Sequence, residues 1–260
     1  LGCVLAFDWN ASGLTTTTLG ALKFAFRGLE KDLGIFICGG KGKTSKKTPD
    51  EIENWGWRLS LGEGEVKRLI YSSRAAAKVD SSLVQDGFQI YHHNFIFTKN
   101  GQWTVIQQGM NVKKGRARRY HWWGDEQKDF VEAPHSGIAS QVFLKNVLDL
   151  TSPKSQQNRE VGVKLVQSSK TFWRDLELLK SAKGNWQFKI LSLPGGEFSH
   201  HPVEREFFNF ENPQFKRALK QTIISRPDNF EKLLMTKGVG AKTIRAISLV
   251  AEVIYGAKPS

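Results

Sequence analysis

Between residues 78 and 121 the sequence gathers side chains that can move protons or hold a metal ion. Imidazoles beside carboxylates can bind a divalent cation or transfer protons near neutral pH. The residues that we expect to form a catalytic centre are Lys78, Asp80, Asp86, His92, His93 and His121. No H-E-x-x-H, C-x-x-C or nucleophile-elbow spacing accompanies them. A network of polar side chains that satisfy one another inside the protein is therefore the alternative.

A metal site is the more specific expectation for part of this group. Asp8 offers a further carboxylate after an apolar start, and the expected ligands for Mg²⁺ or Mn²⁺ are Asp8, Asp80, Asp86 and His93. An Asp at the end of an element can equally serve as a turn residue or a helix cap. The metal site therefore depends on residue types and not on a recognised ligand spacing.

A β-hairpin is the clearest element that would position these side chains. Residues 91–97 and 103–108 flank Asn100-Gly101, and Asn-Gly supplies the positive φ angles that a tight turn needs. Alternation along the first strand places the adjacent histidines 92 and 93 on opposite faces. Pairing about the turn brings this histidine pair near the glutamine pair 107–108.

The remaining patterns predict a mixed α+β chain. An apolar run over 33–38 predicts a buried strand, and apolar periodicity predicts helices over 49–60, 64–79, 138–149, 153–168 and 170–182. The helix at Pro49 is expected to have Thr48 as its N-cap and Glu51 as the partner in a capping box. We expect a mixed catalytic domain over residues 1–211, with several helices and a small sheet containing the hairpin, and a helical segment over 212–260.

The strongest motif lies in the helical segment, where two helical patterns flank Gly238-Val239-Gly240. It resembles a helix-hairpin-helix, in which backbone N–H groups at the start of the second helix hold a DNA phosphate. The expected DNA contacts here are Lys237, Gly238, Gly240, Lys242, Thr243 and Arg245. An ordinary pair of helices joined by a glycine turn is the alternative.

The net charge of +13 points to a polyanionic partner. Residues 212–260 carry nine basic and three acidic side chains, so much of the excess lies around the glycine motif. Two further basic runs supply expected DNA contacts at Lys41, Lys43, Arg118 and Arg119. The first run follows Gly39-Gly40 but departs from a P-loop, which requires glycine at position 37. A loop that touches phosphate and a solvated basic loop remain alternatives.

Other classes of protein are excluded by simple counts. Two cysteines cannot build a disulfide framework or a four-cysteine zinc site. No apolar run approaches the roughly 20 residues that span a bilayer. We therefore expect a cytoplasmic protein with DNA as its partner and no membrane association, and the sequence leaves the oligomeric state open.

Several short motifs are spread over the chain, and they include Phe7-Asp8-Trp9, Lys78-Val79-Asp80, Tyr91-His92-His93, Gln107-Gln108-Gly109, Arg118-Arg119-Tyr120-His121-Trp122 and Pro134-His135-Ser136-Gly137. Together they resemble the archaeal and bacterial family of unknown function numbered 763. The resemblance implies a leading segment with a His-Gly-Gly stretch and further sequence after residue 260, so the chain is expected to be trimmed at both ends. The family pattern is similar to Phe-Asp-Trp-His where this sequence has Asn10. The resemblance also implies DNA handling.

The sequence thus predicts a DNA-binding enzyme, in the first place a divalent-metal-dependent deoxyribonuclease in DNA processing or repair. Metal-bound water would attack phosphorus, and a carboxylate or histidine would take its proton. A non-catalytic nucleic-acid-binding module of a repair or recombination assembly is the alternative. A DNA glycosylase or lyase in which Lys78 attacks a sugar is the third hypothesis.

Overall fold

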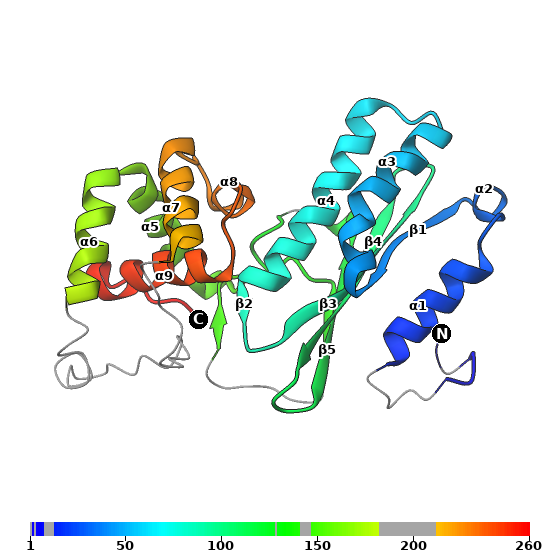
Figure 1. Ribbon diagram of the computed structural model, residues 1–260, viewed down its shortest axis with the longest axis horizontal. Coiled ribbons are helices and arrows are strands. Elements are labelled where there is room, and N and C mark those ends of the chain that lie inside the picture. The colour runs from blue at the N-terminus through cyan, green and yellow to red at the C-terminus, as the bar shows by residue number, and fades with distance from the viewer. Residues whose placement is uncertain (1, 3, 8–12, 128, 141–146, 182–211) are drawn as a thin grey trace. The chain divides into compact units, whose positions relative to one another are not determined.

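The computed structural model describes residues 2, 4–7, 13–127, 129–140, 147–181 and 212–260 (Figure 1). The chain divides into two compact units. The sheet unit comprises 1–80, 87–128 and 134–143, and the helical unit comprises 81–86, 129–133 and 144–260. This division differs from a boundary at residue 211, because the helical unit also takes in earlier helices and two short early segments. The α+β class is confirmed.

The sheet unit is built on a five-stranded antiparallel sheet. In spatial order its strands are β1 (Ile35–Lys41), β3 (Gln89–Thr98), β4 (Trp103–Asn111), β5 (Arg116–Trp123) and β6 (Gly137–Ser140). The predicted hairpin is confirmed, since β3 pairs with β4 so that His92 opposes Gln108 and His93 opposes Gln107. Gly101 in its turn has φ of +80°. The strand predicted over 33–38 is β1, shifted toward the glycines.

Helices cover both faces of this sheet (Figure 1). The helices of the unit are α1 (Leu14–Ala25), α2 (Glu30–Leu33), α3 (Thr48–Arg58) and α4 (Glu63–Ser82). Two short 3₁₀ helices, η1 (Gly42–Lys47) and η2 (Gly124–Glu126), come directly before α3 and directly after β5. The α4 side of the sheet holds an aromatic core that includes Phe95, Phe97, Tyr120 and Trp122, all fully buried. Coverage of both faces explains why the two adjacent histidines, on opposite sides of β3, are both buried.

The predicted helices over 49–60 and 64–79 are confirmed as α3 and α4, but the predicted capping box is wrong. The Thr48 hydroxyl donates to the Ser45 carbonyl, and Glu51 accepts a hydrogen bond from the Gly39 amide. The reason is that β1 is an edge strand, whose outward amide needs an acceptor. Glu51 meets this need instead of capping its own helix.

The helical unit contains α5 (Gln156–Gln167), α6 (Ser169–Ser181), α7 (Pro213–Ser225), α8 (Phe230–Met235) and α9 (Ala241–Tyr255). A short η3 (Pro153–Ser155) precedes α5, and β2 (Val84–Gln85) pairs with β7 (Leu148–Asp149). The helices predicted over 153–168 and 170–182 are thus confirmed. The helix predicted over 138–149 is wrong, because both of its described ends pair as strands, β6 with β5 and β7 with β2. None of the described helices combines the length and apolarity needed to cross a membrane.

Candidate functional site

The sheet separates the residues that the sequence groups into one catalytic centre. Asp80 on α4 and His93 on β3 meet on the α4 face. His92 and His121 belong to the opposite face, because side chains alternate along β3 and β5. Lys78 is half-buried on α4, and burial lowers its pKa. Asp86 is buried and belongs to the helical unit.

On the α4 face, three donors converge on the Asp80 carboxylate, which is 0 % exposed. Its Oδ2 accepts from Gln107 Nε2 at 2.5 Å and from Trp122 Nε1 at 3.0 Å. Its Oδ1 is hydrogen-bonded to His135 Nε2, which reaches it from the segment before β6. Both carboxylate oxygens are therefore occupied by protein groups.

His93 continues the same network. Its Nδ1 lies 3.0 Å from Gln107 Oε1, and its Nε2 lies 2.9 Å from Ser73 Oγ. Burial lowers the pKa of His93, and the contacts with Gln107 and Asp80 oppose this shift in part. An amide oxygen only accepts, so the neutral ring carries its proton on Nδ1 and accepts from the Ser73 hydroxyl at Nε2.

A serine that donates to an imidazole is the pairing used in nucleophilic catalysis. Ser73, however, is only 2 % exposed, and Asp80 and His93 are also buried. A substrate has no route to the serine hydroxyl without displacement of α4 from the sheet. The Asp80 network, defined as Ser73, Asp80, His93, Gln107, Trp122 and His135, is therefore an internal polar network that ties α4 to the sheet.

The predicted metal ligands do not come together in the described part of the chain. Asp80 and His93 are close, but their polar atoms already have protein partners. Asp8 lies outside the described residues. Among the residues described, no three His, Cys, Asp or Glu side chains are grouped so that they could hold a metal ion.

On the opposite face, a row of polar side chains crosses four strands. Strand register aligns Lys41 with His92, His92 with Gln108, and Gln108 with Arg119. Directly paired residues project on the same side of a sheet. We call these four residues the α1-side row. The adjacent row includes Asn94 and His121, which flank Ile106.

Helix α1 covers this row. Arg119 Nη1 donates to Thr15 Oγ1 at 3.3 Å near the start of α1. Near its end, Lys23 Nζ donates to the Gly39 carbonyl on β1 at 2.8 Å. The helix therefore runs across the strands, from β5 to β1. Its residues Thr15, Thr18 and Leu19 are buried.

This face differs from the α4 face because several of its buried polar atoms lack partners among the described residues. They are Thr18 Oγ1, both ring nitrogens of His92, Asn94 Oδ1 and Arg119 Nε. Burial lowers the pKa of His92 to about 4, with smaller contributions from nearby charges, while the neighbouring Asn94 side chain opposes the shift. The imidazole is therefore neutral near pH 7, with one nitrogen that can donate and one that can accept.

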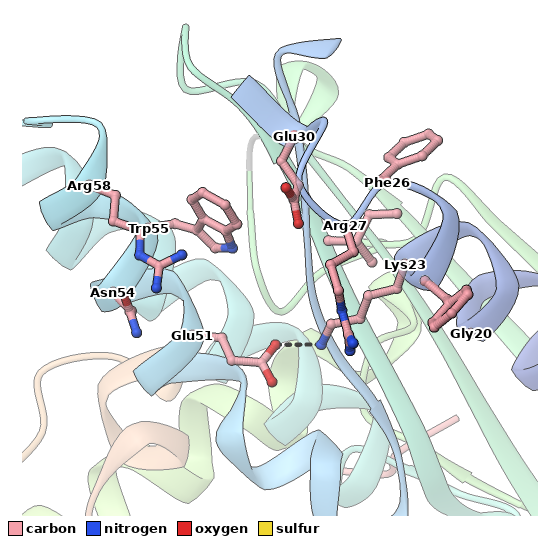
Figure 2. A pocket seen from close by; sticks show the side chains of 11 residues that line it. Gly20, Lys23, Phe26, Arg27, Glu30, Glu51, Asn54, Trp55 and Arg58 are labelled. Atoms are coloured by element: carbon pink, nitrogen blue, oxygen red, sulfur yellow. Dashed lines mark hydrogen bonds and ion pairs between the residues drawn. The ribbon is translucent and has the colours of Figure 1, made fainter. Parts of the chain in front are cut away.

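A groove of about 360 Å³ lies at the β1 edge, between α1 and α3 (Figure 2). The Lys23 ammonium reaches Glu51 across it at 2.6 Å, and Arg58 stacks over the Trp55 ring at 5.1 Å. The same Glu51 oxygen accepts from the Gly39 amide at 2.8 Å. None of the buried unpartnered atoms of the described residues belongs to the groove lining. The charged side chains of Lys23 and Glu51 instead form hydrogen bonds with the backbone of the edge strand β1 at Gly39.

The expected DNA contacts of the sheet unit have different surroundings. Lys41 and Lys43 are exposed. Arg118 is buried, and its guanidinium lies 4.4 Å from the centre of the Phe88 ring. Arg119 belongs to the α1-side row. Arg118 therefore packs inside the protein, although the basic run in the sequence predicts it as a surface contact.

In the helical unit, α8 and α9 are joined by the turn 236–240. Gly238 has φ of +86°, Val239 is buried, and Gly240 precedes the first residue of α9. Lys237 and Lys242 are exposed on either side of the two glycines. The first turn of α9 contains no acidic residue. The positive end of the helix is thus combined with two ammonium groups.

Two of the expected contacts in this hairpin, Thr243 and Arg245, have other surroundings. Thr243 is 3 % exposed, so its side chain belongs to the core. Arg245 Nε donates to Gln85 Oε1 at 2.6 Å, and Gln85 Nε2 donates to the Ala241 carbonyl at 2.9 Å. Arg245 therefore helps to attach α9 to the segment that contains β2.

Four members of the Asp80 network were not selected as site residues by sequence reasoning: Ser73, Gln107, Trp122 and His135. His135 lies 55 positions from Asp80, so no local spacing connects them. A comparison with curated proteins and a comparison with solved structures give no match. A family model described as a protein of unknown function (DUF763) matches residues 1–260, and the chain belongs to that family.

Proposed function

We propose that the helical unit binds the sugar-phosphate backbone of DNA through the α8–α9 hairpin, which would act as a helix-hairpin-helix. The observation that carries the proposal is the start of α9, a 15-residue helix whose first turn has no acidic residue and contains exposed Lys242, with exposed Lys237 in the turn before it. Free N–H groups at a helix start and nearby ammonium groups suit a phosphate.

The charge around the hairpin supports the same partner. Residues 212–260 carry nine Lys and Arg, and eight of them are exposed. Of the three acidic residues in this segment only Asp228 is exposed, and its carboxylate pairs with Lys232 at 2.7 Å. A DNA duplex would therefore meet a surface with little opposing negative charge.

Contacts of this kind recognise phosphates and not base edges, so the binding would not depend on DNA sequence. It would weaken as salt is raised, because each neutralised phosphate releases bound counterions.

The test is fluorescence anisotropy with a labelled duplex, measured over a series of salt concentrations for the whole chain. Lys237→Ala/Lys242→Ala should lower the slope of log K against log salt by about 2, since each phosphate contact contributes about 0.9. The matched control is Lys31→Ala/Lys99→Ala, which removes the same charge from exposed positions of the sheet unit. Equal slopes for the two double variants would contradict the assignment of the hairpin.

The geometry favours a binding module over the predicted nuclease, because the polar atoms of Asp80 and His93 are already partnered inside the sheet unit. Hydrolysis remains a prediction that the same DNA can test. The labelled duplex and single strands are incubated with Mg²⁺, Mn²⁺ or a chelator, and the products are separated by size. Metal-dependent cleavage that disappears in Asp80→Asn would return that residue to a catalytic role.

A further inference from the structure

Between α1 and the sheet lie buried polar atoms that have no partner among the described residues. The two ends of α1 are fixed by Thr15 at β5 and Lys23 at β1. Eight residues of helix advance about 12 Å, and three strand spacings amount to about 14 Å. Thr18, three residues after Thr15, therefore lies about one strand spacing from β5 toward β1, near β4 and its member of the α1-side row.

Five buried atoms in this layer have no partner among the described residues, and they come from Thr18, His92, Asn94 and Arg119. His92 and Asn94 are each 1 % exposed. Buried polar atoms are almost always hydrogen-bonded in native proteins, since loss of water is costly to them. Several such atoms on one side of one sheet indicate a binding partner that occupies this layer.

The charges of the layer define the chemistry of that partner. The α1-side row contains Lys41 and Arg119, and neither this row nor the adjacent Asn94 and His121 includes a carboxylate. Arg119 Nε, the Thr18 hydroxyl and one His92 nitrogen can each donate a hydrogen bond. We propose that the α1-side row, together with Thr18, binds a phosphoryl group.

A phosphoryl group fits these donors for two reasons. Its several oxygens can accept from donors that arrive from both the helix and the sheet, and a guanidinium matches its geometry. A phosphate that keeps one proton also has a hydroxyl that can donate to Asn94 Oδ1. The row opens to solvent at exposed Lys41 on the edge strand, and Lys43 is exposed beside it. The proposal does not depend on DNA binding by the hairpin, which belongs to the other unit.

Calorimetric titration with inorganic phosphate at constant ionic strength tests this site in the whole chain. We expect saturable binding that is lost in His92→Phe and weakened at least fivefold in Lys41→Ala. Phenylalanine fills the space of a ring whose nitrogens have no partner in the described part of the chain, so the variant should stay folded. The matched control is Thr98→Val, which removes another unpartnered buried atom of β3, six residues away on the same face.

Two further ligands separate a nucleic-acid phosphate from a free one: a 5′-phosphorylated oligonucleotide and the same oligonucleotide without the phosphate. Binding of inorganic phosphate that disappears in His92→Phe supports a site for free phosphate. Binding only of the 5′-phosphorylated oligonucleotide, with the same loss, supports a nucleic-acid end. The proposal is overturned if neither phosphate source binds, or if His92→Phe binds as the wild type does. Lys237→Ala/Lys242→Ala should keep full phosphate binding here, even if it loses duplex binding.

Discussion

Replacement of Asp80 by alanine should cost a large part of the stability of the sheet unit. The substitution removes the acceptor of Trp122 Nε1 and His135 Nε2, whereas Gln107 Nε2 keeps a second acceptor in the Ala76 carbonyl at 3.2 Å. Each buried donor left unpaired costs about 1–3 kcal/mol, so we expect a loss of about 2–6 kcal/mol. Native domains have only about 5–15 kcal/mol to lose.

Asp80→Asn should restore most of this loss. The amide oxygen can accept from Gln107 and Trp122, and its NH₂ can donate to His135 Nε2 when the imidazole carries its proton on Nδ1. We expect a residual loss of about 1–2 kcal/mol, because a carboxylate accepts stronger hydrogen bonds than an amide. A role in metal binding or catalysis would not be rescued in this way, since an amide lacks the charge.

The assay is urea unfolding followed by tryptophan fluorescence, with hydrogen exchange of the Trp122 indole N–H as a local readout. The control is Asp125→Asn, an exposed carboxylate that accepts from Gln102 at 2.9 Å, and it should change stability by less than about 0.5 kcal/mol. The structural assignment is refuted if Asp80→Ala is as stable as the wild type. It is also refuted if asparagine is as damaging as alanine.

Three further predictions follow from single features. Gly39→Ala should prevent stable folding or lower the free energy of unfolding by more than about 3 kcal/mol. The reason is that φ is +89° and a Cβ would lie 2.2 Å from the His93 carbonyl oxygen. Thermal melting measures the loss, and a near-native melting temperature would contradict the prediction. Arg245→Ala should lower stability by about 1–2 kcal/mol through its lost bond to Gln85, yet change duplex affinity less than Lys237→Ala/Lys242→Ala does. His92 has a native pKa near 4 against a reference of 6.5, so stability should be full above about pH 6.5 and fall as pH drops toward 4, since the unfolded chain takes up the proton first. Between about pH 4 and 6.5, the urea midpoint should depend less on pH in His92→Phe than in the wild type. An unchanged pH dependence would contradict the lowered pKa of His92.

The hairpin could be predicted because its information is local. Asn100-Gly101 marks the position of the turn, although the loop spans residues 99–101, since Thr98 N–H donates to the Gln102 carbonyl. The proximity of the histidine pair to the glutamine pair follows from this, whereas the exact pairing of His92 with Gln108 and of His93 with Gln107 is known only from the structure. The start of α9 was equally accessible, since glycines and a new helical pattern mark it.

Contacts between distant segments could not be predicted in this way. His135 approaches Asp80 from a segment without regular structure, and nothing near either residue specifies the other. Helix α1 was also missed, because the threonine run at 15–18 has low helix propensity. The helix forms because Thr15, Thr18 and Leu19 face the sheet, and burial of a helix face outweighs weak propensity.

The two histidines of β3 show why the site could not be located from composition alone. Both are buried and both have lowered pKa values, so the strand supplies the same chemistry on each side. The difference lies in the covering helix. Helix α4 brings Ser73 and Asp80, which complete the hydrogen bonds on the side of His93.

Among the described residues, helix α1 provides no such complement for His92. Its buried Thr18 adds another unpartnered hydroxyl, and its Thr15 engages only one nitrogen of Arg119. If evolution required only a stable sheet, apolar residues at positions 18, 92 and 94 would remove the cost of these atoms. Their polarity is therefore explained by a ligand, and the side of the sheet beneath α1 is where functional variants of the sheet unit should have their largest effect.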